Sequence, residues 1–114
     1  MMKVKNIIAG LPVKNLTKSA EWYKDVFSPK EELVPSDGMI EYKIGDMWIM
    51  LFEGKAADCD NCVNFEVENL EKEYKRLQDT GIIKNEAIEE VPDVVRYFSF
   101  KDPDGNNLCL VEVY

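Results

Sequence analysis

The stretches Leu11-Pro-Val-Lys-Asn-Leu16 and Asn64-Phe-Glu-Val-Glu-Asn-Leu70 decide the fold of this chain, because they are two copies of one phrase. Each copy is an apolar segment that ends in Val-x-Asn-Leu and runs into a stretch with helical spacing of apolar residues. The two copies are separated by about half of the 114 residues. The sequence therefore predicts a duplicated half, and a repeated unit that packs on its copy places a binding site between the halves.

Apolar spacing and turn residues predict the order βαβββ in both halves. In the first half we expect a strand over Val4–Pro12 and a helix over Leu16–Phe27, which Ser28-Pro29 stops. Three strands joined by hairpin turns should follow, over Glu31–Val34, Ile40–Ile44 and Met47–Phe52. A linker, Gly54–Asn61, follows. The second half then repeats this order with a strand over Cys62–Val67, a helix from Leu70 that stops at Gly81, and three strands over Ile83–Val91, Val94–Phe100 and Leu108–Val113. We expect one α+β domain over 1–114, with repeat halves of about 1–54 and 60–114.

The charge of the chain limits its partners. Asp and Glu outnumber Lys and Arg by 22 to 14, the formal net charge is −8, and no basic block interrupts this excess. Such a surface repels phosphate backbones, so we expect neither nucleic acid nor an anionic membrane as a partner, whereas a cationic small molecule would be attracted. We expect a cytoplasmic protein, since no apolar run approaches the length of a membrane span and the first residues do not resemble a secretory signal.

Histidine is absent and cysteine is scarce. The lack of histidine removes the commonest general base and the commonest transition-metal ligand. A Ser-His-Asp or Cys-His nucleophile is therefore excluded within a single chain. The three cysteines, Cys59, Cys62 and Cys109, are too few for a disulfide framework.

The chain resembles the glyoxalase, bleomycin-resistance and extradiol-dioxygenase superfamily, also called vicinal oxygen chelate. The resemblance rests on the doubled βαβββ order and on two motifs, Leu11-x-Val13-x-Asn15-Leu16-x-x-Ser19-x-x-Trp22-Tyr23 and Arg96-Tyr-Phe-Ser-Phe-Lys-Asp-Pro-Asp-Gly-Asn106, and it covers Lys5 to Val113. It implies two βαβββ modules that form a curled mixed sheet, an open barrel with the helices outside, whose lumen holds a metal or a ligand. It also implies a homodimer.

The resemblance further implies up to four strand positions that carry metal ligands in the enzymes, mostly His, Glu or Gln. The matching positions in this chain are Ile8, Met50, Cys62 and Cys109. None of these side chains offers the oxygen or imidazole donor that Mg²⁺, Mn²⁺ or Fe²⁺ prefers. We therefore expect no metal, no cofactor and no catalytic residue of the superfamily's usual kind.

Strand alternation extends these four positions to a whole lumen wall. The expected ligand-binding residues are Ile8, Trp48, Met50, Phe52, Cys62, Asn64, Glu66, Tyr97, Ser99 and Cys109. Residues of the opposite parity, such as Leu11, Phe98 and Leu110, should pack beneath the helices. A mixture of apolar and aromatic walls with a few polar groups is typical of a small-molecule pocket. The same aromatic residues would also suit a barrel core or a dimer interface.

The residues favour a binding protein over an enzyme. We expect a metal-independent member of the superfamily that sequesters a cationic or aromatic compound such as an antibiotic, as bleomycin-resistance proteins do. One alternative is an enzyme, either a lyase or isomerase similar to lactoylglutathione lyase or a dioxygenase. A second alternative is a soft-metal or thiol sensor that uses Cys59, Cys62 and Cys109, the first two forming a CxxC pair.

Overall fold

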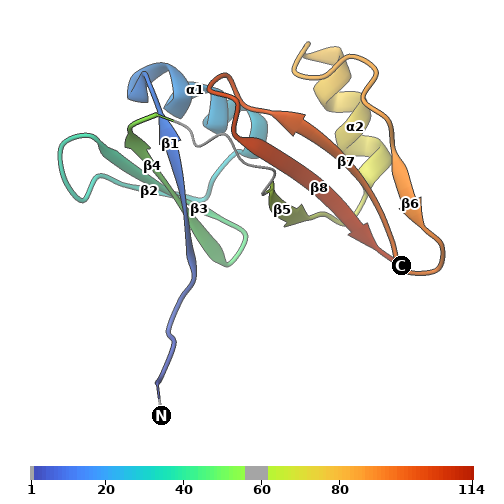
Figure 1. Cartoon of the computed structure of the whole chain (residues 1–114), viewed down its shortest axis with the longest axis horizontal. Helices are drawn as coiled ribbons and strands as arrows, with labels where there is room; N and C mark the ends of the chain where they lie inside the picture. The colour runs from blue at the N-terminus through green and yellow to red at the C-terminus, as the bar shows by residue number, and fades with distance from the viewer. Residues whose placement is uncertain (1, 56–61) are drawn as a thin grey trace. The chain divides into compact units, whose positions relative to one another are not determined.

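The computed structural model describes residues 2–55 and 62–114. They form two compact units, of which unit 1 holds the described residues up to 55 together with Pro103–Asn106, and unit 2 holds 62–102 and Asn107–Tyr114. Each unit is built around one βαβββ module with its own sheet and helix (Figure 1), so the expected α+β fold class is confirmed. Neither helix in this part of the chain has the length and apolar character that crossing a membrane requires.

Unit 1 is a mixed sheet with one helix. Its elements are β1 (Ile8–Val13), α1 (Leu16–Phe27), β2 (Glu31–Leu33), β3 (Met39–Ile44) and β4 (Met47–Glu53). The sheet order is β1-β4-β3-β2, with β1 parallel to β4 and the other pairs antiparallel. The side chain of Asn15 accepts a hydrogen bond from the Lys18 backbone N–H at 3.0 Å and thereby caps α1.

The core of unit 1 lies between α1 and one face of its sheet. Leu11 and Val13 of β1 and Ile49 and Leu51 of β4 are buried there, and they stand at alternate positions along both strands. Buried Ala20, Tyr23 and Val26 supply the matching face of the helix. Strand alternation therefore leaves the other face of this sheet to Ile8, Trp48, Met50 and Phe52.

Unit 2 repeats this arrangement. Its elements are β5 (Cys62–Glu66), α2 (Leu70–Asp79), β6 (Glu89–Val91), β7 (Val95–Lys101) and β8 (Asn107–Val113), in the sheet order β5-β8-β7-β6. Asn69 caps α2 by accepting from the Lys72 backbone N–H at 3.1 Å, so each copy of the repeated phrase provides the N-cap of its helix. Under α2 the core contains Leu108, Leu110 and Phe98, and the ring of Phe98 meets that of Tyr74 edge to face.

The prediction for the first strand is wrong at its N-terminal end. The strand β1 starts at Ile8, not Val4, and the side chains of Val4 and Ile7 are each 67% exposed. Ile8 pairs with Trp48, and β4 itself begins only one residue before Trp48. Within 2–55 and 62–114, residues 2–7 therefore have no partner strand. An apolar composition alone does not make a strand.

The strand expected over Ile83–Val91 is also wrong for most of its length, because only Glu89–Val91 forms β6. Ile83 is 2% exposed and belongs to the core of unit 2. The side chains of Gln78 and Tyr74, both on α2, donate hydrogen bonds at 2.8 Å to the carbonyls of Lys84 and Glu86. The helix thus satisfies backbone groups that a neighbouring strand would otherwise bind.

Among the described residues neither sheet closes on itself, and each remains a four-stranded open sheet. The binding site that the sequence places between the halves stays a prediction, and so does the division into a single domain with two halves.

Candidate functional site

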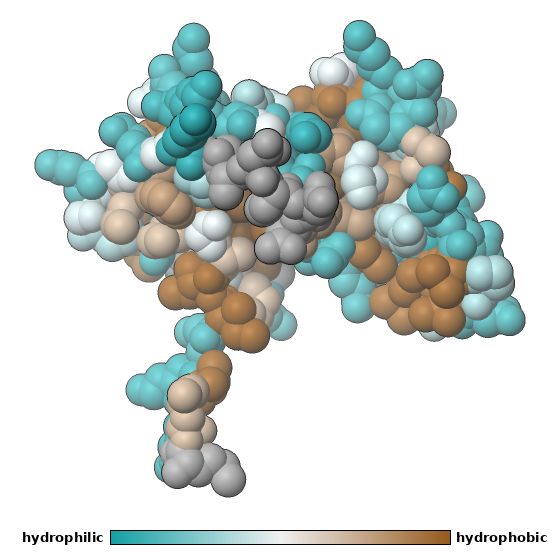
Figure 2. All heavy atoms as spheres, in the orientation of Figure 1, coloured by the Kyte–Doolittle hydropathy of each residue, from teal (hydrophilic) through white to brown (hydrophobic). Residues whose placement is uncertain are grey.

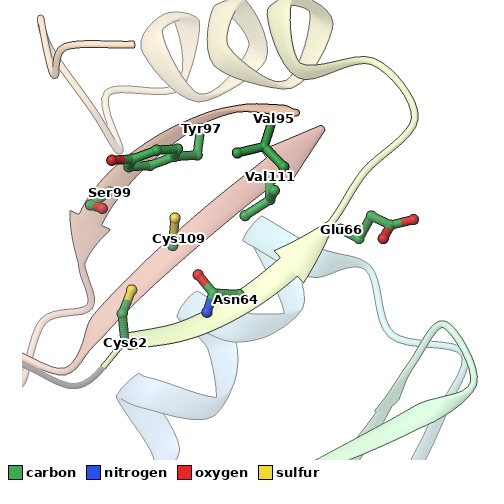
Figure 3. A pocket seen from close by; sticks show the side chains of 8 residues that line it. All are labelled: Cys62, Asn64, Glu66, Val95, Tyr97, Ser99, Cys109 and Val111. Atoms are coloured by element: carbon green, nitrogen blue, oxygen red, sulfur yellow. The ribbon is translucent and has the colours of Figure 1, made fainter. Parts of the chain in front are cut away.

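A hollow of about 620 Å³ lies over one face of the unit 2 sheet. Eight side chains from β5, β7 and β8 line it (Figure 3): Cys62, Asn64, Glu66, Val95, Tyr97, Ser99, Cys109 and Val111. All eight stand on the face of the sheet opposite to Phe98, Leu108 and Leu110, which are buried under α2. We call this concavity the unit 2 hollow.

The register of the three strands sets two rows across the hollow. In one row Asn64 of β5, Cys109 of β8 and Ser99 of β7 are direct partners. In the next row Glu66, Val111 and Tyr97 are partners in the same way. Because partner side chains on one face of a sheet lie close together, each row presents neighbouring groups to anything that enters the hollow.

Two thiols form part of the floor. Cys62 and Cys109 both point into the hollow (Figure 3), and Cys109 is 4% exposed. Burial, and then the charge and hydrogen bond of the Cys109 thiol, raise the pKa of Cys62 to about 11. Cys62 therefore stays protonated near neutral pH and supplies little of the thiolate that nucleophilic chemistry requires.

One end of the hollow is apolar. Val95 and Val111 line it there together with Tyr97. Val91 of β6 and Val113 of β8 are both direct partners of Val95, so an apolar row runs across three strands beside the hollow. Figure 2 shows exposed apolar atoms gathered at this end of unit 2, near the C-terminus.

The other end is polar, and the lining contains neither Lys nor Arg. Asn64 and Ser99 offer an amide and a hydroxyl beside the two thiols. Glu66 is exposed, and its carboxylate points away from the thiols (Figure 3), so it does not act as a buried general base. Arg96 lies on the opposite face of β7, where its guanidinium contacts the Glu71 carboxylate at 2.9 Å.

Comparison with known proteins identifies the fold. No protein-family model matches the chain, and no curated protein matches it in sequence. Solved structures do match along nearly its whole length. Lactoylglutathione lyase from Agrobacterium tumefaciens is 18% identical, with 97% of this chain and 95% of that chain covered and a TM-score of 0.79. The chain has the fold of the glyoxalase and bleomycin-resistance superfamily.

Two further structures share this glyoxalase-type fold. A glyoxalase/bleomycin resistance protein from Catenulispora acidiphila is 20% identical, covering 96% of this chain and 98% of that chain at a TM-score of 0.75. The fosfomycin resistance protein FosX from Listeria monocytogenes, complexed with Mn(II) and sulfate, is 24% identical, covering 100% and 93% at a TM-score of 0.80. At these identities the likeness establishes the fold alone.

The structure gathers the ten residues that the sequence assigned to a glyoxalase-type lumen into two groups. Cys62, Asn64, Glu66, Tyr97, Ser99 and Cys109 line the unit 2 hollow. Ile8, Trp48, Met50 and Phe52 share one face of the unit 1 sheet, where Ile8 and Trp48 are direct partners and all four are exposed or half-buried. Cys59 lies outside the described residues.

Two lining residues are absent from the ten expected ligand-binding residues: Val95, and Val111, which strand alternation from Cys109 turns inward. Val95 stands two positions before Tyr97 on β7, and Val111 two positions after Cys109 on β8. Strand alternation from those predicted neighbours would have found both. What the sequence could not give is the extent of the hollow along the strands.

A hard divalent cation does not fit this donor set. No group of three or more Cys, Asp or Glu within the described part of the chain is placed to hold a metal ion. At the strand positions where the resemblance puts metal ligands, the hollow offers the sulfur atoms of Cys62 and Cys109. Mn²⁺ prefers carboxylate, carbonyl and water oxygens. The hollow therefore differs chemically from a manganese site.

Proposed function

We propose that the chain is a metal-independent small-molecule-binding protein whose unit 2 hollow takes a ligand without a divalent cation. The observation that supports this most is the lining itself. Valines, a tyrosine and the exposed Glu66 stand at one end and an amide, a hydroxyl and two thiols at the other, all within a volume of about 620 Å³. A mainly apolar concavity with a few polar groups is the usual form of a small-molecule site.

The polarity of the hollow limits the chemical class of ligand that fits it. An apolar or aromatic part would contact Val95, Tyr97 and Val111, and hydrogen-bonding groups would reach Asn64 and Ser99. With no Lys or Arg in the lining and a net charge of −8 on the chain, an anionic ligand would find no countercharge. A neutral or cationic compound with an aromatic part fits best, and sequestration of an antibiotic of that kind is the role we propose.

The two alternatives have less support from the site. An enzyme of lyase or dioxygenase type would use metal ligands, and the matching strand positions in the hollow carry thiols. The second alternative is a soft-metal or thiol sensor. Sensing through thiol reactivity would need a reactive thiolate, and the pKa of Cys62 is raised to about 11 by its burial and by Cys109. A homodimer and a cytoplasmic location remain predictions, the first of which light scattering of the purified protein tests.

A thermal-shift screen with a blocked variant tests the proposed function. Cationic antibiotics and neutral aromatic compounds are screened in the presence of a chelator, and a binder at 100 times its Kd should stabilise the protein by about 2.7 kcal/mol. Val111→Phe fills the hollow and should abolish the shift. Val113→Phe is the matched control, because Val113 lies on the same strand and face yet outside the lining and is 53% exposed.

The pair of variants decides where a compound binds. A shift that persists in Val111→Phe, or that both variants abolish equally, would count against the hollow as the site. If no compound of these classes raises the melting temperature of the natural protein, the proposed function is wrong.

A further inference from the structure

The two thiols of the hollow stand on neighbouring strands although their backbones are not direct partners. Cys62 pairs with Asn107 and Cys109 pairs with Asn64, so the cysteines occupy diagonal positions on the adjacent strands β5 and β8. Both side chains nevertheless point into the hollow from the same face of the sheet (Figure 3), and the Cys109 thiol is near enough to contribute to the raised pKa of Cys62. Each sulfur also lies near the carbonyl of the next residue, at 3.8 Å for Cys62 and 3.9 Å for Cys109.

This arrangement is poorly suited to a disulfide. The parallel strands β5 and β8 lie about 4.8 Å apart and each residue rises about 3.3 Å, so the diagonal Cα atoms of Cys62 and Cys109 are roughly 8 Å apart. A disulfide rarely spans more than about 7 Å between Cα atoms and needs the strands to move. The ladder between β5 and β8, five residue pairs long, holds those strands in place. An atom that bonds to both sulfurs at once meets no such restriction, since it adds length between them.

We propose that Cys62 and Cys109 together bind one soft, thiophilic metal cation, of which Cu(I) is the best match. Soft thiolate ligands select Cu(I), zinc and iron–sulfur clusters among the common metals. Structural zinc requires four ligands, whereas Cu(I) accepts two thiolates. Within the described residues no third Cys, Asp or Glu joins the pair, so the donor set matches the cation of lower coordination number.

The surroundings suit such an ion. Cys109 is buried and Cys62 is half-buried, so the ion would enter from the open side of the hollow and then be shielded from water. Val111 and Tyr97 provide apolar neighbours, and Asn64 is the strand partner of Cys109. Each thiol gives up its proton to solvent as its sulfur–copper bond forms, and copper keeps its oxidation state. The site does not depend on the organic ligand of the proposed function.

The test is a competition titration of the full-length reduced protein with Cu(I) alone, under nitrogen, against a coloured Cu(I) chelator. We expect one equivalent of Cu(I) per chain and a thiolate-to-copper charge-transfer band in the ultraviolet. Cys62→Ala and Cys109→Ala should each weaken the affinity by at least about a hundredfold, as expected when one of two ligands is lost. Mn²⁺ under the same conditions should not bind.

Cys59→Ala is the matched control, since it removes a thiol three residues from Cys62 and leaves the proposed pair intact. An unchanged titration for Cys59→Ala supports the pair. Loss of binding in Cys59→Ala would assign the metal to the CxxC motif and overturn the proposal, as would an unchanged affinity in Cys62→Ala. Because Cys109 is buried, Cys109→Ser is measured as a second variant and the melting curve of each variant is recorded. Failure of the copper titration leaves the ligand screen unaffected, because that screen contains a chelator.

Discussion

Asp104 accepts a hydrogen bond from the hydroxyl of Ser19 at 2.9 Å, although 85 residues separate them in the sequence. Its other carboxylate oxygen accepts one from the Lys14 backbone N–H at 2.8 Å. The side chain of Asn106 donates to the Pro12 carbonyl, also at 2.8 Å. The turn Pro103–Asn106 therefore holds the backbone that leads from β1 into α1. Ser19 belongs to one of the two motifs that carry the resemblance, and Asp104 belongs to the other. Their contact gives a physical reason why each motif contains that residue.

Asp104→Ala should destabilise the protein. It removes the acceptor of two hydrogen bonds, one of them from the buried hydroxyl of Ser19. Hydrogen bonds to charged groups contribute about 1.5–3 kcal/mol each, with incomplete additivity, so we expect a loss of about 2–4 kcal/mol in the free energy of unfolding. Urea unfolding measures it. Asp46→Ala, in the exposed turn between β3 and β4, should change stability by less than about 0.5 kcal/mol. Equal losses in both variants would contradict this role of Asp104.

Ile83→Ala should cost about 2–4 kcal/mol, because the side chain is 2% exposed and its removal leaves a cavity in the core of unit 2. Ile88→Ala is the matched control. That side chain is 38% exposed, and we expect its loss to cost well under 1 kcal/mol. Denaturant unfolding of the two variants compares them directly. If Ile88→Ala proved the more damaging change, the segment after α2 would not pack as described.

Tyr74→Phe isolates one hydrogen bond between α2 and the segment that follows it. The variant keeps the edge-to-face contact with Phe98 and loses the donor to the Glu86 carbonyl. We expect a loss of about 0.5–1.5 kcal/mol. Hydrogen exchange should speed up for the backbone near Glu86 and stay unchanged in β7 and β8. Unchanged exchange near Glu86 would show that the bond does not order this segment.

Stability should fall in alkali because of Cys62. Its pKa is raised from 9.0 to about 11 by burial, and then by Cys109, so the unfolded chain loses this proton near pH 9 and the folded chain only near pH 11. The folded state binds more protons within this window, so its stability is full below pH 9 and declines towards pH 11. Urea unfolding of the natural protein and of Cys62→Ala across this range checks the sign. The variant should decline less.

The natural protein and the variant share the other alkaline contributions. Burial, with Glu32 as a neighbour, raises the pKa of Tyr42 as well, and this adds to the decline in both proteins. The difference between the two curves therefore reports on Cys62. Parallel curves would mean that the Cys62 thiol is not desolvated in the folded state.

Much of the fold follows from the sequence because the local signals agree. Asn15 and Asn69 have the residue type of an N-cap, and each caps the helix that follows it. The alternation that places Tyr97 and Ser99 on one face of β7 and Phe98 and Phe100 on the other is the observed one. Strand parity is robust because a one-residue slip would expose every buried side chain of the strand.

The wrong strand predictions have a common physical cause. An apolar residue indicates that its position can be buried, but it does not indicate which element will cover it. Among the described residues Ile7 and Val4 have no partner strand, and the buried Ile83 donates its backbone N–H to the Leu77 carbonyl of α2 instead of joining the sheet. The contact of Ser19 with Asp104 depends on tertiary structure, and neither residue signals it alone. The shape of the hollow also depends on tertiary structure, because the register of three strands decides which side chains stand in one row.

Because the turn Pro103–Asn106 belongs to unit 1, the two compact units do not correspond to two continuous stretches of the chain. A fragment that stops at residue 55 would contain every helix and strand of unit 1 but would leave the Lys14 N–H and the Ser19 hydroxyl without Asp104. The N-terminal module therefore depends for these polar contacts on a turn from the far end of the chain. Anyone who recombines or transplants this module has to transfer a distant tetrapeptide with it.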